Sequence, residues 1–174
     1  IYQGYSPGMW ALEPVYPQAG GSSDWVAWFM NNLIHQPSLA FAYTQAGQEN
    51  SFGWDAMKTG LTLQIALFAR QAKAGEIQVM TLEQAGKWFR RHYALTPPTA
   101  VVYQNDWKHE NRKTVWYDSR FYRLNMLWEN NGFFIRDLHC FDENIVSPTH
   151  DRVLATTSLA YETLPVMDGA LWSD

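Results

Sequence analysis

The chain has a single cysteine, Cys140, among its 174 residues. One thiol excludes an internal disulfide and also excludes a zinc site built from several cysteines. Charged residues are scarce as well, at 17% of the chain, against about a quarter in a typical globular protein. The net charge of -4, the pI near 5.7 and the lack of any basic run argue against nucleic acid as the main partner.

Long hydrophobic runs and several well-known motifs are also missing. No window reaches the roughly 18 apolar residues of a membrane-spanning helix, so we expect no membrane span. The phosphate-binding patterns GxGxxG and GxxxxGK(S/T) do not occur, and neither does the nucleophile elbow GxSxG. Nucleotide chemistry and acyl transfer by a serine triad are therefore disfavoured. The sequence opens on IYQGYSPGMW, with no signal peptide and no initiator Met, and we interpret it as an internal fragment of a longer protein.

Aromatic residues are abundant, at 16% of the chain, with nine each of Trp, Tyr and Phe. The face of a pyranose ring packs well on an indole or phenol ring, so this composition fits a protein that stacks sugars. The other interpretation is that the rings fill the core, where most large aromatic side chains of globular proteins lie. Composition alone leaves both interpretations open.

The first half of the chain has the pattern of a repeated strand–helix unit. Short apolar runs at residues 10–16, 38–43 and 76–80 are strand candidates, and a helix-like segment follows each of them. The helices are predicted at residues 25–36, 53–75 and 81–94. Such alternation favours a parallel sheet with crossover helices, either an open doubly wound sheet or the later strands of a (β/α) barrel.

Beyond Pro97 and Pro98 the pattern changes to strand-like runs separated by turns. The runs at residues 99–104, 113–119, 121–130, 132–141 and 152–164 predict an antiparallel β module. Asn130-Asn131-Gly132 has the composition of a tight hairpin turn. We therefore expect an α/β part followed by an all-β part (α+β overall), with domains at residues 1–96 and 97–174.

Candidate site residues follow from the predicted parallel units. Ligands of such folds collect where the βα loops leave the carboxyl ends of the strands. Glu13 and Glu49 are then expected on one rim of the sheet, and glycoside hydrolysis requires such a pair of carboxylates. The predicted substrate-binding residues are Tyr16, Gln45, Gln48, Asn50 and Trp54. The alternative is that Glu49 stabilises the start of the next helix and that the amides are only solvated.

A metal site is not expected. Asp137 and His139 lie two apart on a predicted strand and share a face, and Asp142, Glu143 and His150 follow them. This spacing is unspecific for a metal, and hydrogen-bonded pairs at the end of a strand explain the residues more simply. We predict no metal ligand and no cofactor.

Four segments carry a resemblance to known proteins: ALEPVYP, HQPSLAFAYTQAGQENSFGW, TLEQAGKWFRRHY and YETLPVMDGALWSD. They resemble bacterial glycoside-hydrolase-like proteins, in which a (β/α) barrel related to polysaccharide deacetylases is followed by a β-sandwich region. The resemblance implies that the chain spans the end of the barrel and the start of the β region. Deacetylase-type barrels carry their metal-binding Asp and His residues early, so the resemblance also implies that this chain lacks them.

Two hypotheses about function follow. The first is a fragment of a carbohydrate-active enzyme, a glycosidase-like hydrolase of a polysaccharide or oligosaccharide, which implies a periplasmic or extracellular location. The second is a non-catalytic glycan-binding or structural module whose β half exposes aromatic side chains such as Trp107, Trp116, Tyr117 and Trp128. Because a partial barrel leaves sheet edges uncovered, we also expect self-association or contact with missing parts of the parent chain.

Overall fold

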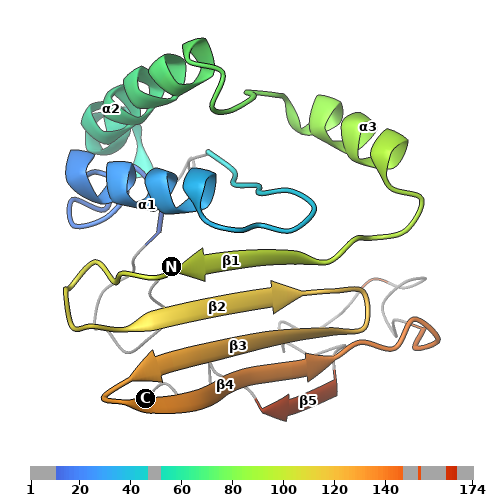
Figure 1. Ribbon diagram of the computed structural model, residues 1–174. Helices are drawn as coiled ribbons and strands as arrows, with labels where there is room; N and C mark the ends of the chain where they lie inside the picture. Colours follow the sequence, from blue (N-terminus) through green and yellow to red (C-terminus); the bar gives the residue numbers. More distant parts are fainter. Residues whose placement is uncertain (1–10, 47–51, 147–152, 154–163, 168–174) are drawn as a thin grey trace.

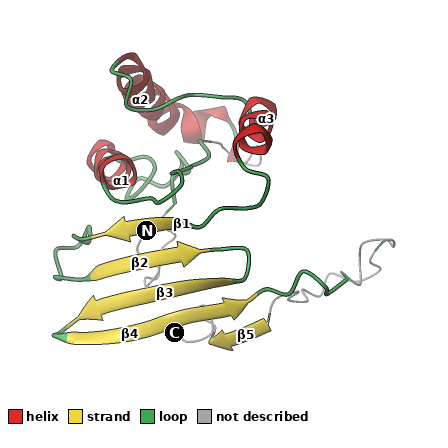
Figure 2. Cartoon of the chain, turned by 45° about the vertical axis from the view of Figure 1, so that its right-hand side comes forward, coloured by secondary structure: helices red, strands yellow, loops and turns green. Residues whose placement is uncertain are grey.

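The computed structural model describes residues 11–46, 52–146, 153 and 164–167. In these ranges the helices are α1 (Ser23–His35), α2 (Trp54–Lys73) and α3 (Leu82–His92). The strands are β1 (Thr99–Tyr103), β2 (Lys113–Asp118), β3 (Tyr122–Glu129), β4 (Gly132–Cys140) and β5 (Leu164–Met167). The strands form one antiparallel sheet in the order β1-β2-β3-β4-β5, and the helices lie beyond its β1 edge (Figure 1, Figure 2). The protein is a small α+β fold.

The prediction of parallel β-α units is wrong. Of the runs expected as parallel strands, residues 11–16 form turns, residues 38–43 give only an antiparallel bridge from Leu39 to Thr99, and residues 76–80 have no regular structure. Leu39 and Val79 are 59% and 71% exposed, so these runs are not buried as central strands are. A short apolar run does not by itself distinguish a strand from an extended connection.

Residues 11–21 wrap against α2 instead of entering a sheet. Gln64 is 1% exposed, and its Nε2 donates to the carbonyl oxygens of Leu12 and Gly20, both at 2.6 Å. Gly60, one turn earlier on α2, has no room for a side chain, because a Cβ there would lie 2.2 Å from the carbonyl oxygen of Pro14. Since these contacts satisfy the backbone of the segment locally, it needs no strand partner.

The helices begin and end close to their predicted limits. Ser22 caps α1 by accepting from the backbone N–H of Trp25 at 3.4 Å. The predicted start of α3 is confirmed as a capping box between Thr81 and Gln84. Gly75 follows α2 with a φ of +77°, a conformation that costs glycine little and ends the helix.

The hydrophobic core lies between α1, α2 and β1. Its buried members are Ala19, Trp25, Val26, Phe29, Met30 and Tyr103. Trp25 stacks on Phe29 with ring centroids 5.3 Å apart, and Trp28 joins Tyr103 of β1 at 5.0 Å. Strands β2, β3 and β4 supply no member of this cluster in the described part of the chain, so they extend the sheet away from the helical layer (Figure 2).

Strand pairing divides the sheet into two faces, because paired residues of neighbouring strands share a face. We call the face that includes the core residues Val101 and Tyr103 the inward face. Its other members on β2, β3 and β4 are Thr114, Trp116, Asp118, Arg123, Asn125, Leu127, Glu129, Phe134, Asp137 and His139. The outward face comprises Ala100, Val102, Lys113, Val115, Tyr117, Tyr122, Leu124, Met126, Trp128, Phe133, Ile135, Leu138 and Cys140.

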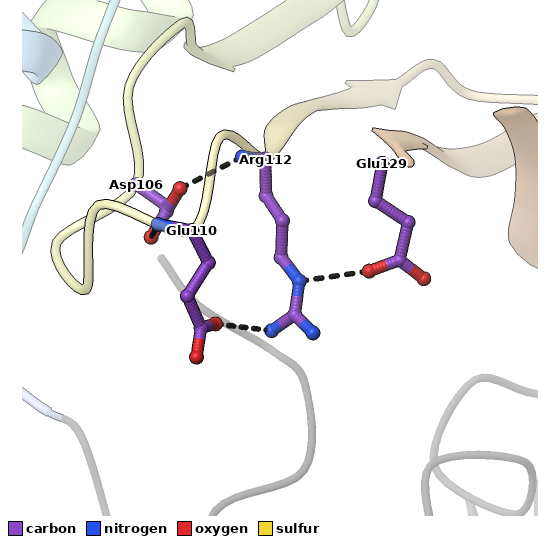
Figure 3. A network of polar contacts seen from close by, with 4 residues as sticks. All are labelled: Asp106, Glu110, Arg112 and Glu129. Carbon is purple, nitrogen blue, oxygen red and sulfur yellow. Dashed lines mark hydrogen bonds and ion pairs between the residues drawn. The ribbon is translucent and has the colours of Figure 1, made fainter. Parts of the chain in front are cut away.

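Two connections fix the register of the strands. Asn130 and Asn131, with φ of 49° and 62°, form the tight turn between β3 and β4 that was predicted from the sequence. The loop from β1 to β2 is held by Asp106, whose Oδ1 accepts from the N–H of Glu110 at 3.1 Å and whose Oδ2 accepts from the N–H of Arg112 at 2.8 Å (Figure 3). The Arg112 guanidinium then joins that loop to Glu129 at the end of β3, at 2.7 Å (Figure 3).

We predict that Asp106→Ala lowers the free energy of unfolding by about 1–3 kcal/mol at pH 7, because it leaves two backbone N–H groups without their acceptor. Burial raises the pKa of Asp106, but the N–H donors of the loop outweigh burial and hold the pKa below its usual 3.8. A lowered pKa contributes stability above the unfolded value, and this contribution is lost as the pH falls through the folded pKa.

Urea unfolding of both proteins between pH 7 and pH 3 measures this contribution. The difference between wild type and Asp106→Ala should be constant above about pH 5 and should shrink below about pH 4. Glu110→Ala is the matched control, because it removes only a half-exposed partner of Arg112 and should cost under about 1 kcal/mol. A difference that does not change with pH would contradict this role of Asp106.

Candidate functional site

The outward face carries two pairs of aromatic rings, in which Trp128, Phe133 and Tyr122 are exposed and Tyr117 is partly buried. Trp128 on β3 and Phe133 on β4 are 38% and 52% exposed, and their ring centroids lie 5.0 Å apart. Tyr117 on β2 and Tyr122 on β3 form the other pair, at 5.4 Å. Because side chains alternate along β3, every second residue from Tyr122 to Trp128 lies on this face.

Between the ring pairs the outward face is aliphatic. Val115, Met126 and Ile135 form one row across the strands, and Leu124 pairs with Leu138 in the next. Ile135 is 44% exposed, so this part of the face is open as well. Lys113 is the one charged residue that strand pairing assigns to the outward face; Arg136 lies at the irregularity of β4 between Ile135 and Asp137, and the pairing assigns it to neither face.

The phenol of Tyr117 in the second ring pair is a hydrogen-bond donor at neutral pH. Burial raises the pKa of Tyr117 above its ordinary value, and the neighbouring Tyr122 raises it further. The protonated hydroxyl can both donate and accept, and it already shares hydrogen bonds with the side chains of Tyr122 and Ser119. This pair offers an apolar ring surface with a polar group at its edge, which is the combination that sugar hydroxyls and C–H groups require.

The inward face has the opposite character: its middle is polar and buried. Asp137 is 3% exposed, and its Oδ2 accepts from Nη2 of Arg123 at 3.0 Å. His139 is 1% exposed, with Nε2 3.5 Å from Oδ1 of Asp137. The Arg123 guanidinium lies over the ring of Trp116, 5.8 Å from its centroid. The prediction that Asp137 and His139 share a face is confirmed, and burial keeps both away from a dissolved ligand.

Asp118 lies beside this buried group, directly opposite Arg123 in the register of β2 and β3. Burial raises the pKa of the Asp118 carboxyl, and the charge of Asp137 raises it further, while Arg123 lowers it. The net direction is upward, so the surroundings disfavour the ionised form. A carboxyl in such surroundings can hold a proton more readily than an exposed aspartate does.

Some of the residues predicted for a sugar site lie in the described part of the chain. Glu13 belongs to the turns of residues 11–21, and its Oε2 is buried with no hydrogen-bond partner among the described residues. The ring of Tyr16 meets the ring of Phe52 edge-on at 6.3 Å. Trp54 begins α2 and is 59% exposed, and Gln45 is exposed in the connection after α1.

The other predicted site residues are Gln48, Glu49 and Asn50, and they lie outside the described residues. The rim that was expected to bring Glu13 and Glu49 together is not part of the fold, because parallel strands are not found in the described ranges. The pairing of these two carboxylates therefore stays a prediction without the geometry from which it was derived.

The four aromatic residues expected on the surface of the β half divide between different environments. Trp128 and Tyr117 lie on the outward face as described above. Trp116 lies on the inward face under Arg123, and Trp107 packs against Trp28 of the core at 5.9 Å. Sequence reasoning missed Tyr122 and Phe133, although the alternation of apolar residues in YRLNMLWE places Tyr122 on the same face as Trp128.

Comparison of the chain with protein-family models, with curated proteins and with solved structures found no match. The resemblance to glycoside-hydrolase-like proteins therefore stays a prediction. In the described ranges, no three His, Cys, Asp or Glu side chains are grouped so that they could hold a metal ion. None of the helices in the same ranges has both the length and the apolar character that crossing a membrane requires.

We predict that Asp118→Asn stabilises the protein more at pH 7 than at pH 3. The raised pKa means that the contribution of Asp118 is full below the unfolded value near 3.8 and is lost as the pH rises through the folded pKa. An amide avoids this loss because it does not ionise. Denaturant midpoints of both proteins at the two pH values measure the difference.

Glu143→Gln serves as the control with the opposite sign. The hydrogen bond from Arg120 lowers the pKa of Glu143, so this substitution should destabilise at pH 7 and have less effect at pH 3. If Asp118→Asn raises the denaturant midpoint equally at both pH values, or more at pH 3, this result would contradict the environment assigned to Asp118.

Proposed function

We propose that the chain is the glycan-binding part of a carbohydrate-active protein and that the outward face of the sheet is its binding surface. The observation that supports this most is the pair of solvent-open rings Trp128 and Phe133, together with Tyr117 and Tyr122 on the same face. Large apolar patches on a protein surface mark sites of interaction. Aromatic rings that also carry polar groups favour a sugar over a purely apolar ligand.

The spacing of the two ring pairs favours an extended ligand. Tyr122 and Trp128 are six residues apart on β3, which corresponds to about 20 Å at the rise of an antiparallel strand. A monosaccharide can cover only one ring pair, whereas a chain of sugars running along β3 can contact both. The ligand that fits this surface is therefore a polysaccharide or a long oligosaccharide.

We predict that Trp128→Ala and Phe133→Ala each weaken glycan binding by about fivefold, because each removes one stacking surface worth about 1 kcal/mol. The measurement is affinity electrophoresis in gels containing xylan, starch or hydroxyethyl cellulose, after a glycan array has identified the best class of glycan. Far-UV circular dichroism checks that the variants are folded.

Tyr43→Ala is the matched control for these variants. Tyr43 is 55% exposed, but it lies in the connection after α1 and not on the sheet. Its loss should leave binding unchanged. Equal mobility of wild type, Trp128→Ala and Phe133→Ala in every gel would overturn the assignment of the outward face.

Hydrolysis of the bound glycan is the second candidate function, and it rests on Glu13. A buried carboxylate oxygen without a donor is costly unless a ligand or another part of the chain supplies one. Glu13 is thus the better supported of the two carboxylates predicted for glycoside hydrolysis, since Glu49 has no described surroundings.

We predict that Glu13→Gln lowers the hydrolysis rate by at least about 100-fold, which is the smallest usual contribution of a general acid or base. Release of reducing ends from the glycan identified on the array measures the rate. Glu83→Gln, a substitution of an exposed glutamate on α3, is the control and should be silent. Unchanged turnover in Glu13→Gln, or no turnover in wild type, would remove hydrolysis while leaving the binding proposal intact.

A further inference from the structure

We infer that α3 and the Tyr93 that follows it form a flap, which opens from the rest of the protein while the core stays folded. This inference does not depend on the proposed function, because the flap contributes no residue to the outward face. Three properties of the flap support it: how little of it is buried, which side chain holds it, and how its two ends are connected.

Helix α3 contributes nothing to the hydrophobic core. It has no buried residue, and among the described residues none of its side chains packs against the core cluster of α1, α2 and β1. Leu82 in its first turn is 65% exposed, although leucine is usually a core residue. Both views of the chain show α3 standing apart from α1 (Figure 1, Figure 2). Movement of α3 therefore removes no contact from the core.

One aromatic side chain, Phe41 in the connection after α1, holds the flap in place. Its ring centroid lies 5.8 Å from that of Trp88 and 5.7 Å from that of Phe89. It also lies 5.7 Å from the ring centroid of Tyr93, whose hydroxyl donates to the carbonyl oxygen of Ala40 at 3.1 Å. Within the described part of the chain, Phe41 therefore supplies every ring contact between the flap and the rest of the protein.

Phe41 itself is anchored to the sheet by the residues just before it. The N–H of Ala40 donates to the carbonyl oxygen of Pro98 at 3.4 Å, and the N–H of Ala100 donates to the carbonyl oxygen of Ser38 at 3.0 Å. These bonds fix the connection at the edge of β1 and do not involve α3. Opening therefore separates the rings of the flap from Phe41 and leaves Phe41 beside β1.

Irregular connections at both ends of the flap allow it to move. Residues 76–80, between α2 and α3, contain no helix or strand, and Gly75 before them has a φ of +77°. Residues 94–98, between Tyr93 and β1, contain no helix or strand either. Loop positions next to secondary structure absorb the backbone rotation of hinged movements. Neither α2 nor β1 therefore has to change when the flap opens.

A flap that has left Phe41 does not stay helical. Isolated helices shorter than about 12–15 residues are marginal in water, and α3 has 11 residues. Its capping box and the exposed ion pair between Lys87 and Glu83 stabilise it only modestly. Opening therefore breaks backbone hydrogen bonds of α3, which amide hydrogen exchange detects. It also exposes the rings of the flap and of Phe41 together, so a ligand that binds these rings would favour the open state.

Hydrogen–deuterium exchange of the full chain, read by mass spectrometry, tests the inference. After correction for intrinsic rates, we expect the amides of residues 85–93 to exchange at least about 100-fold faster than those of residues 26–35 in α1. Phe41→Ala should speed exchange in the flap at least about tenfold further, because it removes all three ring contacts. Tyr43→Ala is the matched control, because Tyr43 is 55% exposed in the same connection and makes no ring contact with the flap. It should exchange like wild type.

A change in the core separates opening of the flap from unfolding of the whole protein. Val26 is fully buried in α1, so Val26→Ala should speed exchange in α1 at least about tenfold. It destabilises the open and closed states of the flap equally, so exchange in residues 85–93 should stay as in wild type.

Urea below the unfolding transition gives the same comparison on the wild type alone. Exchange in α1 should rise steeply with urea, whereas exchange in the flap should change little, because opening of the flap exposes little surface. Equal exchange in α1 and the flap, equal acceleration of both by Val26→Ala or by urea, or wild-type exchange of the flap in Phe41→Ala would each overturn the inference.

Discussion

The ion pair between Arg123 and Asp137 decides which side of the sheet faces outward. Its N–O distance is 3.0 Å, and the Asp137 side chain is 4% exposed, with His139 next to it. The Arg123 side chain is 35% exposed, but loss of the pair would leave the buried Asp137 carboxylate without its charged partner, which is unfavourable. Side chains alternate along a strand, so a slip of one residue would turn the charges out and the rings in. With Arg123 and Asp137 inward, Tyr122, Trp128 and their neighbours must face outward.

The helices do not cover the outward face, because they pack at one edge of the sheet. Residues of α1 and α2 form the core with Tyr103 of β1, and α3 has no buried residue. The sheet beyond β1 is therefore stabilised mainly by its own strand pairing, by the polar contacts of the inward face and by the Asp106–Arg112–Glu129 contacts at one end (Figure 3). With the core at the β1 edge and the polar contacts on the inward face, the outward face stays apolar. Removal of this apolar surface from water favours binding of a ligand there.

Local signals in the sequence predicted the helices and the hairpin well. Capping by Thr81 and Gln84 and the positive φ of Asn130 and Asn131 depend only on near neighbours, so they can be read from a few residues. The apolar runs at residues 38–43 and 76–80 were wrongly predicted as strands, because the burial of such a run depends on distant parts of the chain. The site was predicted only in part for the same reason. Alternation predicts that Trp128 and Tyr122 share a face, but contacts such as that of Arg123 with Asp137 decide whether that face is open.

Hydroxyl-radical footprinting, read by mass spectrometry, tests the open outward face most directly. Trp128 and Phe133 are 38% and 52% exposed, while Trp25 and Phe29 of the core are 3% and 4% exposed and provide internal controls of the same residue types. In the free chain, Trp128 and Phe133 should be oxidised much faster than their controls, and the glycan identified on the array should protect them. Protection of Trp128 and Phe133 in the free chain, equal to that of Trp25 and Phe29, would contradict the account.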